Sequence, residues 1–439
     1  MIRSAGLDYA PVMKAAHVPT SIAVVLTLLV GWTVFAAAFV HGPYSGAPSA
    51  DSAVISWETD EPVPARVEYG PRGDFEATGA LSEVVFVPVP REEGDNTTHT
   101  MLAELQPAAE YVYRVVLEED EGEVASAVGS FYTAPDPGTS VSFAVLADTQ
   151  WQTETTNPLE LVGDAIASDP TPFQFVLHAG DVVESPSRPY WDHWFSSFDG
   201  MLLRAPFIPV LGNHEKNHRS YYETFCHPPG GGLYEERWWA LHWGDVVVVG
   251  LDTNVTKAAD YLAQQDWARA HLSGPEPHKF VLFHHPVFSS DAYHTDGYFL
   301  DTIYHPIFVE TGVDIVFNGH CHLYERVARD GVTYLVVGGG GADPSEARPE
   351  RVEGSLVLAE RHYFYTRVKT TPDRIYVETI SVAEPKPDDA LVPTGGVLDA
   401  FALPDEGAPT GGSTGWRSAL LVAIGMVAAV WLLLRVLAD

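Results

Sequence analysis

Residues 317–327 read FNGHCHLYERV and place two histidines one residue apart, directly after an apolar run and a glycine. In extended backbone, side chains at positions i and i+2 point to the same side, roughly 6–7 Å apart along the chain. Two imidazoles placed in this way, His320 and His322, suit two separate metal–ligand bonds better than a hairpin turn. The H-x-H pair alone is weak evidence, because a short polar cluster after a strand is usually just a turn.

Other metal-competent side chains follow other buried apolar runs of the sequence. The runs VSFAVLAD, FQFVLHAGD, FIPVLGNH, FVLFHHP and VDIVFNGH have the continuous apolar character of strands that are buried on both faces. Ligands gather at the carboxyl ends of strands in such sheets. A single aspartate there usually caps a helix, but five strand ends with metal-competent side chains are hard to explain as caps. The candidate ligands are Asp148, Asp181, Asn213, His284, His320 and His322.

The types of these six residues point to a pair of metals. Two carboxylates, one carboxamide and three imidazoles suit divalent metals such as Mn, Fe or Zn. Six ligands are too many for one catalytic zinc, which keeps three protein ligands and an open position. Two metals that share a bridging carboxylate can activate water and hold the oxygens of a displacement at phosphorus. The chain has two cysteines, Cys226 and Cys321, and we expect Cys321 to pack rather than to bind metal.

The segment that carries these residues alternates strand and helix patterns. Helical patterns are expected over 157–168, 190–203, 259–272 and 304–311, between the apolar runs. This alternation predicts a layered α/β domain over residues 140–382, in which the strand-like sequence of 350–381 completes a sheet.

The flanking segments have other compositions. Residues 44–134 alternate short strands with turns, which predicts a small β-sandwich. Residues 383–417 are rich in proline, glycine and aspartate, and we expect a flexible stalk there.

Each end of the chain carries an apolar stretch. Residues 22–40 contain no charge and are long enough to cross a bilayer, so residues 1–41 are expected to form an anchor helix or a cleaved signal, with the anchor favoured. A second apolar run predicts a transmembrane helix over 418–437. The protein is therefore expected at the cell membrane, with the α/β domain outside the cytoplasm.

The net charge of the chain limits the classes of partner that it is expected to bind. With 25 basic and 59 acidic residues, the formal net charge is −34. An acidic surface repels phosphate backbones, so nucleic acid is not an expected partner. The oligomeric state is left open.

The motifs also resemble a known family. ADTQ, GDVVE, GNHE, VLFHHP and GHCH occur in the order and approximate spacing of the five blocks of calcineurin-like metallophosphoesterases, with the purple acid phosphatase branch as the best match. SWETDEPVPARVEYG and FYTAP resemble the fibronectin-III-like module that precedes that catalytic domain. The resemblance covers residues 45–381 and implies a sandwich of two mixed sheets flanked by helices.

The resemblance implies a role for each site residue. Asp148, Asp181 and His322 would hold the first metal. Asp181, as the bridge, would hold the second metal with Asn213, His284 and His320. His214 would contact the phosphoryl group, and His294 would face the substrate. His285 would lie in the pocket or behind the ligands.

Two departures from the family pattern concern the first metal. Glu184 stands where purple enzymes have the tyrosine that ligates ferric iron, so both metals are expected to be divalent. Gln150 replaces a histidine found in many other members. The resemblance implies a two-metal phosphomonoesterase, similar to acid phosphatases, that acts on phosphorylated small molecules. A phosphodiesterase or nucleotidase of the same fold and a non-catalytic binding or adhesion protein are the alternatives.

Overall fold

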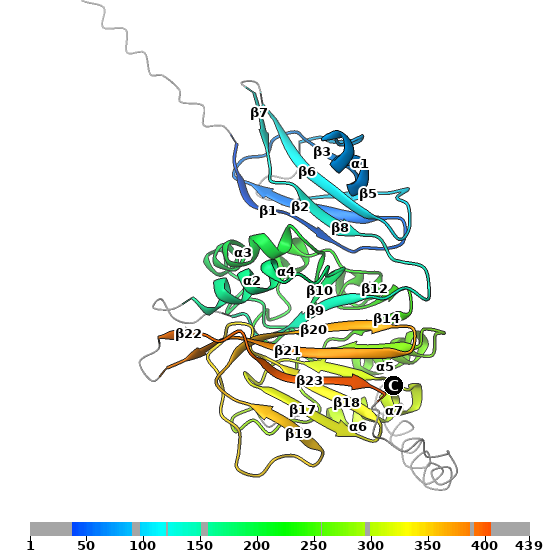
Figure 1. The fold of residues 1–439 in the computed structure, drawn as a ribbon, viewed down its shortest axis with the longest axis vertical. Helices are drawn as coiled ribbons and strands as arrows, with labels where there is room; N and C mark the ends of the chain where they lie inside the picture. The colour runs from blue at the N-terminus through cyan, green and yellow to red at the C-terminus, as the bar shows by residue number, and fades with distance from the viewer. Residues whose placement is uncertain are drawn as a thin grey trace, which may run out of the picture. The chain divides into compact units, whose positions relative to one another are not determined.

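The computed structural model describes residues 37–89, 97–119, 122–150, 157–255, 257–294, 299–386 and 390–404. Two β-sheets build an amino-terminal domain, and two further sheets with helices build a larger domain (Figure 1).

The amino-terminal domain is the β-sandwich that the sequence predicted. One sheet has the order β1 (Phe39–Gly46), β2 (Ala53–Thr59), β5 (Thr97–Leu102). The other has the order β4 (Glu83–Val87), β3 (Ala65–Pro71), β6 (Glu110–Glu119), β7 (Gly122–Ala125), and β8 (Gly129–Tyr132) also pairs with β6. Buried Trp57, Val67 and Phe131 belong to the core of this domain. A short helix, α1 (Arg72–Thr78), follows β3.

The larger domain contains two mixed sheets. The first has the order β11 (Phe207–Pro209), β10 (Phe175–His178), β9 (Ser142–Leu146), β20 (Tyr363–Thr371), β21 (Arg374–Pro385), β22 (Leu391–Pro393), and β23 (Val397–Leu403) also pairs with β21. The second has the order β12 (Gly230–Gly231), β13 (Trp238–Trp243), β14 (Val246–Gly250), β15 (His278–Leu282), β16 (Ile315–Asn318), β18 (Val332–Val337), β17 (Tyr324–Arg329), β19 (Ser355–Ala359).

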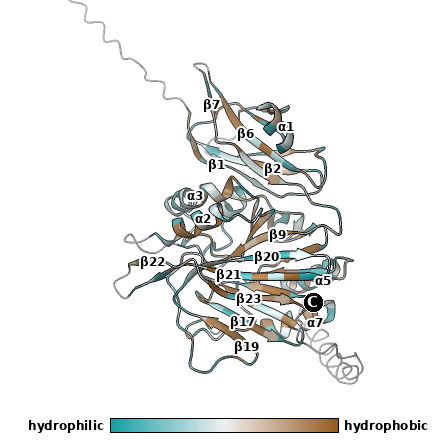
Figure 2. Cartoon of the chain, viewed as in Figure 1, coloured by the Kyte–Doolittle hydropathy of each residue, from teal (hydrophilic) through white to brown (hydrophobic). Residues whose placement is uncertain are grey.

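The core of the larger domain lies between its two sheets. Phe143 and Phe175 of the first sheet belong to one buried cluster with Phe280 and Phe317 of the second. The rings of Phe143 and Phe280 meet edge to face, with centroids 5.3 Å apart. Hydrophobic, brown stretches can be seen along strands of this domain in Figure 2. Because β9, β10 and β11 run parallel, as do β14, β15, β16 and β18, the carboxyl ends within each set lie at one edge of its sheet.

The predicted helices are present, with ends within two residues of the expected positions. They are α2 (Pro158–Ser168), α3 (Arg188–Leu202), α5 (Ala258–Leu272) and α7 (His305–Thr311). Shorter helical turns are α4 (Arg219–Thr224), η1 (Leu233–Glu235) and α6 (Leu300–Ile303). Helices α2 and α3 supply residues to a second buried cluster with β9 and β10. Helices α5 and α7 do the same with β14, β15 and β16.

The prediction of a flexible stalk over 383–417 is wrong for the first half of that segment. Strand β21 continues to Pro385, and both β22 and β23 pair antiparallel with it. Leu398, Phe401 and Leu403 pack against the core between the sheets. The proline, glycine and aspartate residues of this segment obscured its strand pattern. Residues 405–417 lie outside the described part of the chain.

Among the residues that the structure describes, no helix is both long and apolar enough to cross a membrane. Within the described residues, this finding contradicts the predicted transmembrane helices and the cell-membrane location inferred from them, and it gives no support to the outward orientation or the membrane partner. At the amino-terminal end, Phe39 and Val40 begin strand β1 instead of ending a helix. Residues 1–36 and the predicted helix over 418–437 lie outside the described residues.

Candidate metal centre

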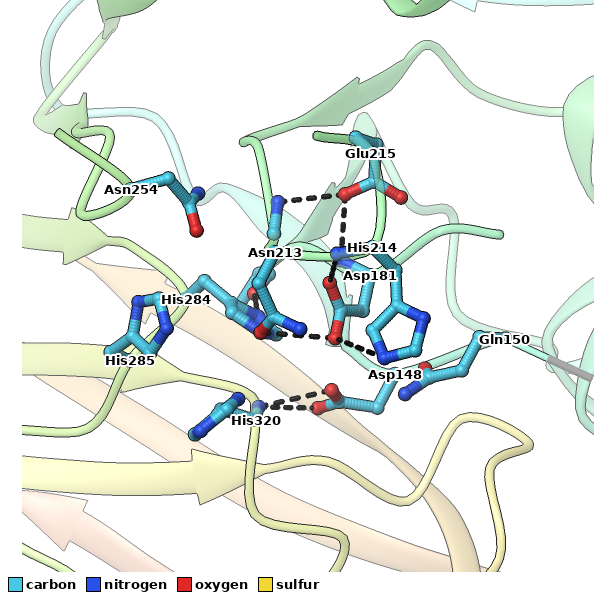
Figure 3. Close-up of polar contacts among 12 residues, drawn as sticks. Asp148, Gln150, Asp181, Asn213, His214, Glu215, Asn254, His284, His285 and His320 are labelled. Carbon is cyan, nitrogen blue, oxygen red and sulfur yellow. Dashed lines mark hydrogen bonds and ion pairs between the residues drawn. The ribbon is translucent and has the colours of Figure 1, made fainter. Parts of the chain in front are cut away.

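The candidate site lies where the parallel strands of both sheets end. Asp148 follows β9, Asp181 follows β10, and His320 follows β16. All three have left-handed backbone, with φ of 59°, 58° and 69°. This conformation costs a non-glycine residue about 1–3 kcal/mol and concentrates at functional sites. These tight turns bring the side chains of different strands together (Figure 3).

His284, after β15, joins two of the other candidates. Its Nε2 lies 3.1 Å from Oδ2 of Asp181 and 3.0 Å from Oδ1 of Asn213. Its Nδ1 donates a hydrogen bond to the carbonyl oxygen of Ala179 at 2.9 Å. Such a bond fixes the ring so that Nε2 faces the site, as is usual for metal-binding histidines. Burial lowers the pKa of His284, but the charge of Asp181 outweighs burial and raises it to about 9.

Asp148 lies on the other side of the site, beside His320 and His322. Both carboxylate oxygens of Asp148 accept from the backbone N–H of His320, at 3.0 and 2.8 Å. The Nδ1 of His322 donates to the carbonyl oxygen of Asp343, and its Nε2 lies 3.7 Å from Oδ1 of Asp148. The structure therefore brings all six predicted ligands to one place, although they come from five strand ends.

The polar groups of this site fit bound cations. Ligand atoms of Asp148, Asp181 and His284 all lie within 4.8 Å of one another. Burial and the neighbouring charge of Asp181 raise the pKa of Asp148, although His284 opposes them. The Oε1 of Gln150, beside His322, is buried without a hydrogen-bond partner. Oxygens and imidazole nitrogens gathered in this way are the ligands that borderline divalent metals prefer.

The two predicted catalytic histidines lie at the open side of the site. The backbone N–H of His214 donates to Oδ1 of Asp181 at 2.8 Å, and its ring Nδ1 donates to the carbonyl oxygen of Glu184 at 2.8 Å. The ring of His294 lies 4.7 Å from that of His320, centroid to centroid. Their side chains are 26% and 36% exposed, whereas that of His284 is fully buried. Both rings can therefore reach a ligand that approaches from solvent.

Glu215 is a residue that the sequence reasoning missed. Its buried carboxylate accepts hydrogen bonds from four backbone N–H groups, those of Gly212, Asp181, Val182 and Val183. It therefore locks the turns after β10 and β11, which carry Asp181 and Asn213. The signal was present, since Glu215 ends the GNHE block.

His285 and Gly338 also border the site. A ligand atom of His285 lies within 4.8 Å of those of His284 and His320. The Nδ1 of His285 is hydrogen bonded to the hydroxyl of Thr253 at 2.8 Å, which holds the ring from behind. A Cβ added to Gly338 would lie 2.7 Å from Oδ2 of Asp148, so this glycine lets the backbone pass close to the site.

Comparisons with known families agree with this geometry. Residues 141–324 match the calcineurin-like phosphoesterase family, and residues 40–133 match the purple acid phosphatase N-terminal domain. The chain contains a calcineurin-like metallophosphoesterase domain. The domain before it is therefore of the purple acid phosphatase N-terminal type, and the expected fibronectin III relationship is not what the match shows.

Relatives of this chain include plant enzymes. The purple acid phosphatase of Glycine max is 25% identical over 311 residues, 65% of each chain. Purple acid phosphatase 1 of Ipomoea batatas is 25% identical over 323 residues, 68% of this chain and 65% of the relative. The chain thus spans just under two thirds of the length of these relatives. Fe(3+)-Zn(2+) purple acid phosphatase 12 of Arabidopsis thaliana is 28% identical over 190 residues, 38% of this chain and 40% of the relative.

Solved structures show the same fold. The purple acid phosphatase PPD1 of yellow lupin aligns with a TM-score of 0.66 at 18% identity, covering 82% of this chain and 73% of that one. PhoD aligns with a TM-score of 0.60 at 14% identity, covering 82% of this chain and 89% of that one.

Proposed function

We propose that this metallophosphoesterase is a two-metal phosphomonoesterase that hydrolyses phosphorylated small molecules. The observation that carries the proposal is the convergence of six metal-competent side chains from five strand ends, in the order that the family motifs prescribe. The purple acid phosphatase relatives support the reaction class, and the relative named for Fe(3+) and Zn(2+) supports a dinuclear centre.

Two divalent ions, of Fe, Mn or Zn, would be held by these residues. Asp148, Asp181 and His322 would hold the first. Asp181 would also bind the second, with the remaining ligands Asn213, His284 and His320. When bound, such a pair lowers the pKa of water and offsets negative charge on the phosphoryl oxygens.

The histidines at the open side would act on the substrate. The ring Nδ1 of His214 is engaged by Glu184, so its Nε2 is the nitrogen that can donate to a phosphoryl oxygen. A donor fixed in advance stabilises the charge that develops on such an oxygen. His294 would hold a proton at its ring for the leaving-group oxygen, which needs one when the ester bond breaks.

Glu184 is the position where this chain departs most from purple enzymes. One oxygen of its carboxylate lies 3.4 Å from Nδ1 of His214. We propose that Glu184 orients His214 rather than binding metal. Without a phenolate ligand, the loaded protein should lack the purple colour of ferric–phenolate enzymes.

Hydrolysis of p-nitrophenyl phosphate tests this function. The full chain, stripped of metal, would be supplied with Mn, Zn or Fe(II) beside Asp181→Asn. Metal-restored turnover that is lost in the variant supports the proposal. Turnover of bis-p-nitrophenyl phosphate alone would favour a diesterase, and silence with both esters in a folded protein would favour a binding protein.

A further inference from the structure

A second group of potential ligands adjoins the proposed metal pair. One ligand atom each from Asp291, His294 and Cys321 lies within 4.8 Å of the other two. Asp291 and Cys321 are fully buried. The proposed function gives no role to either of them. The thiol of Cys321 donates to the carbonyl oxygen of His294 at 3.5 Å and also lies near the Asp291 carboxylate and the His294 ring.

Unpartnered atoms in this group point to a missing ligand. The Oδ1 of Asp291 accepts from the backbone N–H groups of Tyr293 and His294, at 2.8 and 2.7 Å. Its Oδ2 is buried, which raises the pKa of this carboxyl, and makes no hydrogen bond of good geometry, although the Ser345 hydroxyl is close enough to lower that pKa. The Nδ1 of His294 is also buried, and it lies 3.2 Å from Oδ1 of Asp291, whose pKa the ring lowers. Buried polar atoms are rarely left unsatisfied in proteins, because their desolvation is costly.

The backbone that carries these residues is held firmly. Ser290, just before Asp291, donates from both its N–H and its hydroxyl to the buried carboxylate of Glu325, each at 2.6 Å. Asp291 itself forms a β-bridge with Ala347. Cys321 lies between His320 and His322, at the end of β16. Asp291 and Cys321 are therefore carried by ordered backbone, and His294 is tied to Asp291 through its own backbone N–H.

We propose that Asp291, His294 and Cys321 bind a third divalent cation that prefers sulfur, such as Zn²⁺. A thiolate, an imidazole and a carboxylate are common zinc ligands, and three protein ligands leave a fourth position open. The thiol releases its proton to solvent as the Zn–S bond forms. The site is distinct from the proposed pair, whose six ligands contain no sulfur.

Occupation of this site has a consequence for the reaction. A cation held by Nδ1 of His294 fixes a ring that otherwise can turn toward the leaving group. Excess zinc therefore lowers turnover through His294. This consequence rests on the proposed function, whereas the binding of the cation does not.

Co²⁺ loading of the full chain tests the site without reference to turnover. A thiolate bound to Co²⁺ gives a charge-transfer band in the near ultraviolet, which the sulfur-free pair cannot produce. We expect the band in the wild type and in the control Cys226→Ser. In Cys321→Ser and in Asp291→Asn, we expect the band to disappear and the protein to bind one equivalent of metal less. Circular dichroism establishes that each variant is folded.

The outcomes separate the two proposals. Absence of the band in the wild type, or its persistence in Cys321→Ser, overturns the third site. A band with a single equivalent of metal and no turnover upholds the third site while the phosphoesterase proposal fails. If Cys321→Ser does not fold, the Co²⁺ band is measured in Asp291→Asn instead, and its persistence there overturns the third site.

Discussion

Two buried polar clusters of this molecule use the same residue types but pair them differently. Between the amino-terminal and larger domains, the ring of His41 has Glu58 at 2.6 Å on one nitrogen and Asp192 at 2.8 Å on the other. Arg188 pairs with both carboxylates. The His41 ring also stacks on Phe195 with centroids 4.2 Å apart. Each charged group of this cluster has an opposite partner within the protein.

The metal centre lacks this balance. Asp148 and Asp181 are fully buried, and no arginine or lysine pairs with them among the described residues. Asp181 has His284 3.1 Å away, but Asp148 has no cation that close, and the oxygen of Gln150 is unpartnered. Both aspartates have left-handed backbone, a conformation that is costly for a residue other than glycine. The difference teaches how to tell the two kinds of cluster apart: a cluster complete in itself holds domains together, whereas an incomplete one marks where a cation binds.

The largest expected effect comes from removing the shared ligand of the incomplete cluster. Asp181→Asn should lower kcat/KM on the order of 10³-fold, because a metal supplies several kcal/mol of transition-state stabilisation and each 1.36 kcal/mol is tenfold. Steady-state hydrolysis of p-nitrophenyl phosphate measures this. His41→Phe is the matched control from the complete cluster, and an equal loss in that variant would refute the distinction.

Glu215 supports the incomplete cluster from behind, so its loss should have a smaller effect. Glu215→Gln keeps the shape but places an amide N–H against backbone N–H donors. Groups that orient metal ligands typically contribute 10–100-fold to metal affinity or activity. Titration of the stripped protein with Zn²⁺ gives the affinity. Unchanged affinity in a folded variant would show that the turns after β10 and β11 hold without this carboxylate.

The complete cluster should contribute to stability and not to turnover. His41→Phe preserves the stacking on Phe195 but removes two hydrogen bonds to charged groups, so the free energy of unfolding should fall by about 2 kcal/mol. Urea denaturation measures this loss. If His41→Phe keeps the stability of the wild type but lowers kcat, the distinction between the two clusters is wrong.

Acid should weaken the complete cluster through Glu58. Burial raises the pKa of Glu58, but hydrogen bonds from His41 and Arg188 outweigh it and leave the pKa lowered. The stabilisation is therefore full above the unfolded-state pKa of about 4.3 and is lost as pH falls through the lower, folded-state value. Denaturation midpoints between pH 6 and pH 3 should fall less steeply in Glu58→Gln than in the wild type.

Much of the site could be predicted because its residues follow apolar runs that can be recognised from short stretches of sequence. Continuous apolar runs identify buried parallel strands, and parallel strands end at one edge, so residues such as Asp148 and His320 were expected to meet. Strand β23 could not be predicted, since its pairing with β21 is a long-range contact within a segment of turn-forming composition. Glu215 was missed, although it ends the GNHE block, because the sequence does not show which backbone groups its carboxylate contacts. The proximity of Asp291 to Cys321 likewise depends on packing between distant segments.

Strand β23 also affects the order in which the larger domain can fold during synthesis. Its Asp399 accepts from the hydroxyl of Tyr324 and from Nε of Arg326, each at 2.7 Å, and these residues lie in β17, just after His322. A ribosome-bound chain that has not yet exposed residue 399 leaves this hydroxyl and guanidinium without their carboxylate. The polar contacts of β17, the strand that follows the H-x-H motif, are thus completed only when β23, the last described strand, has emerged.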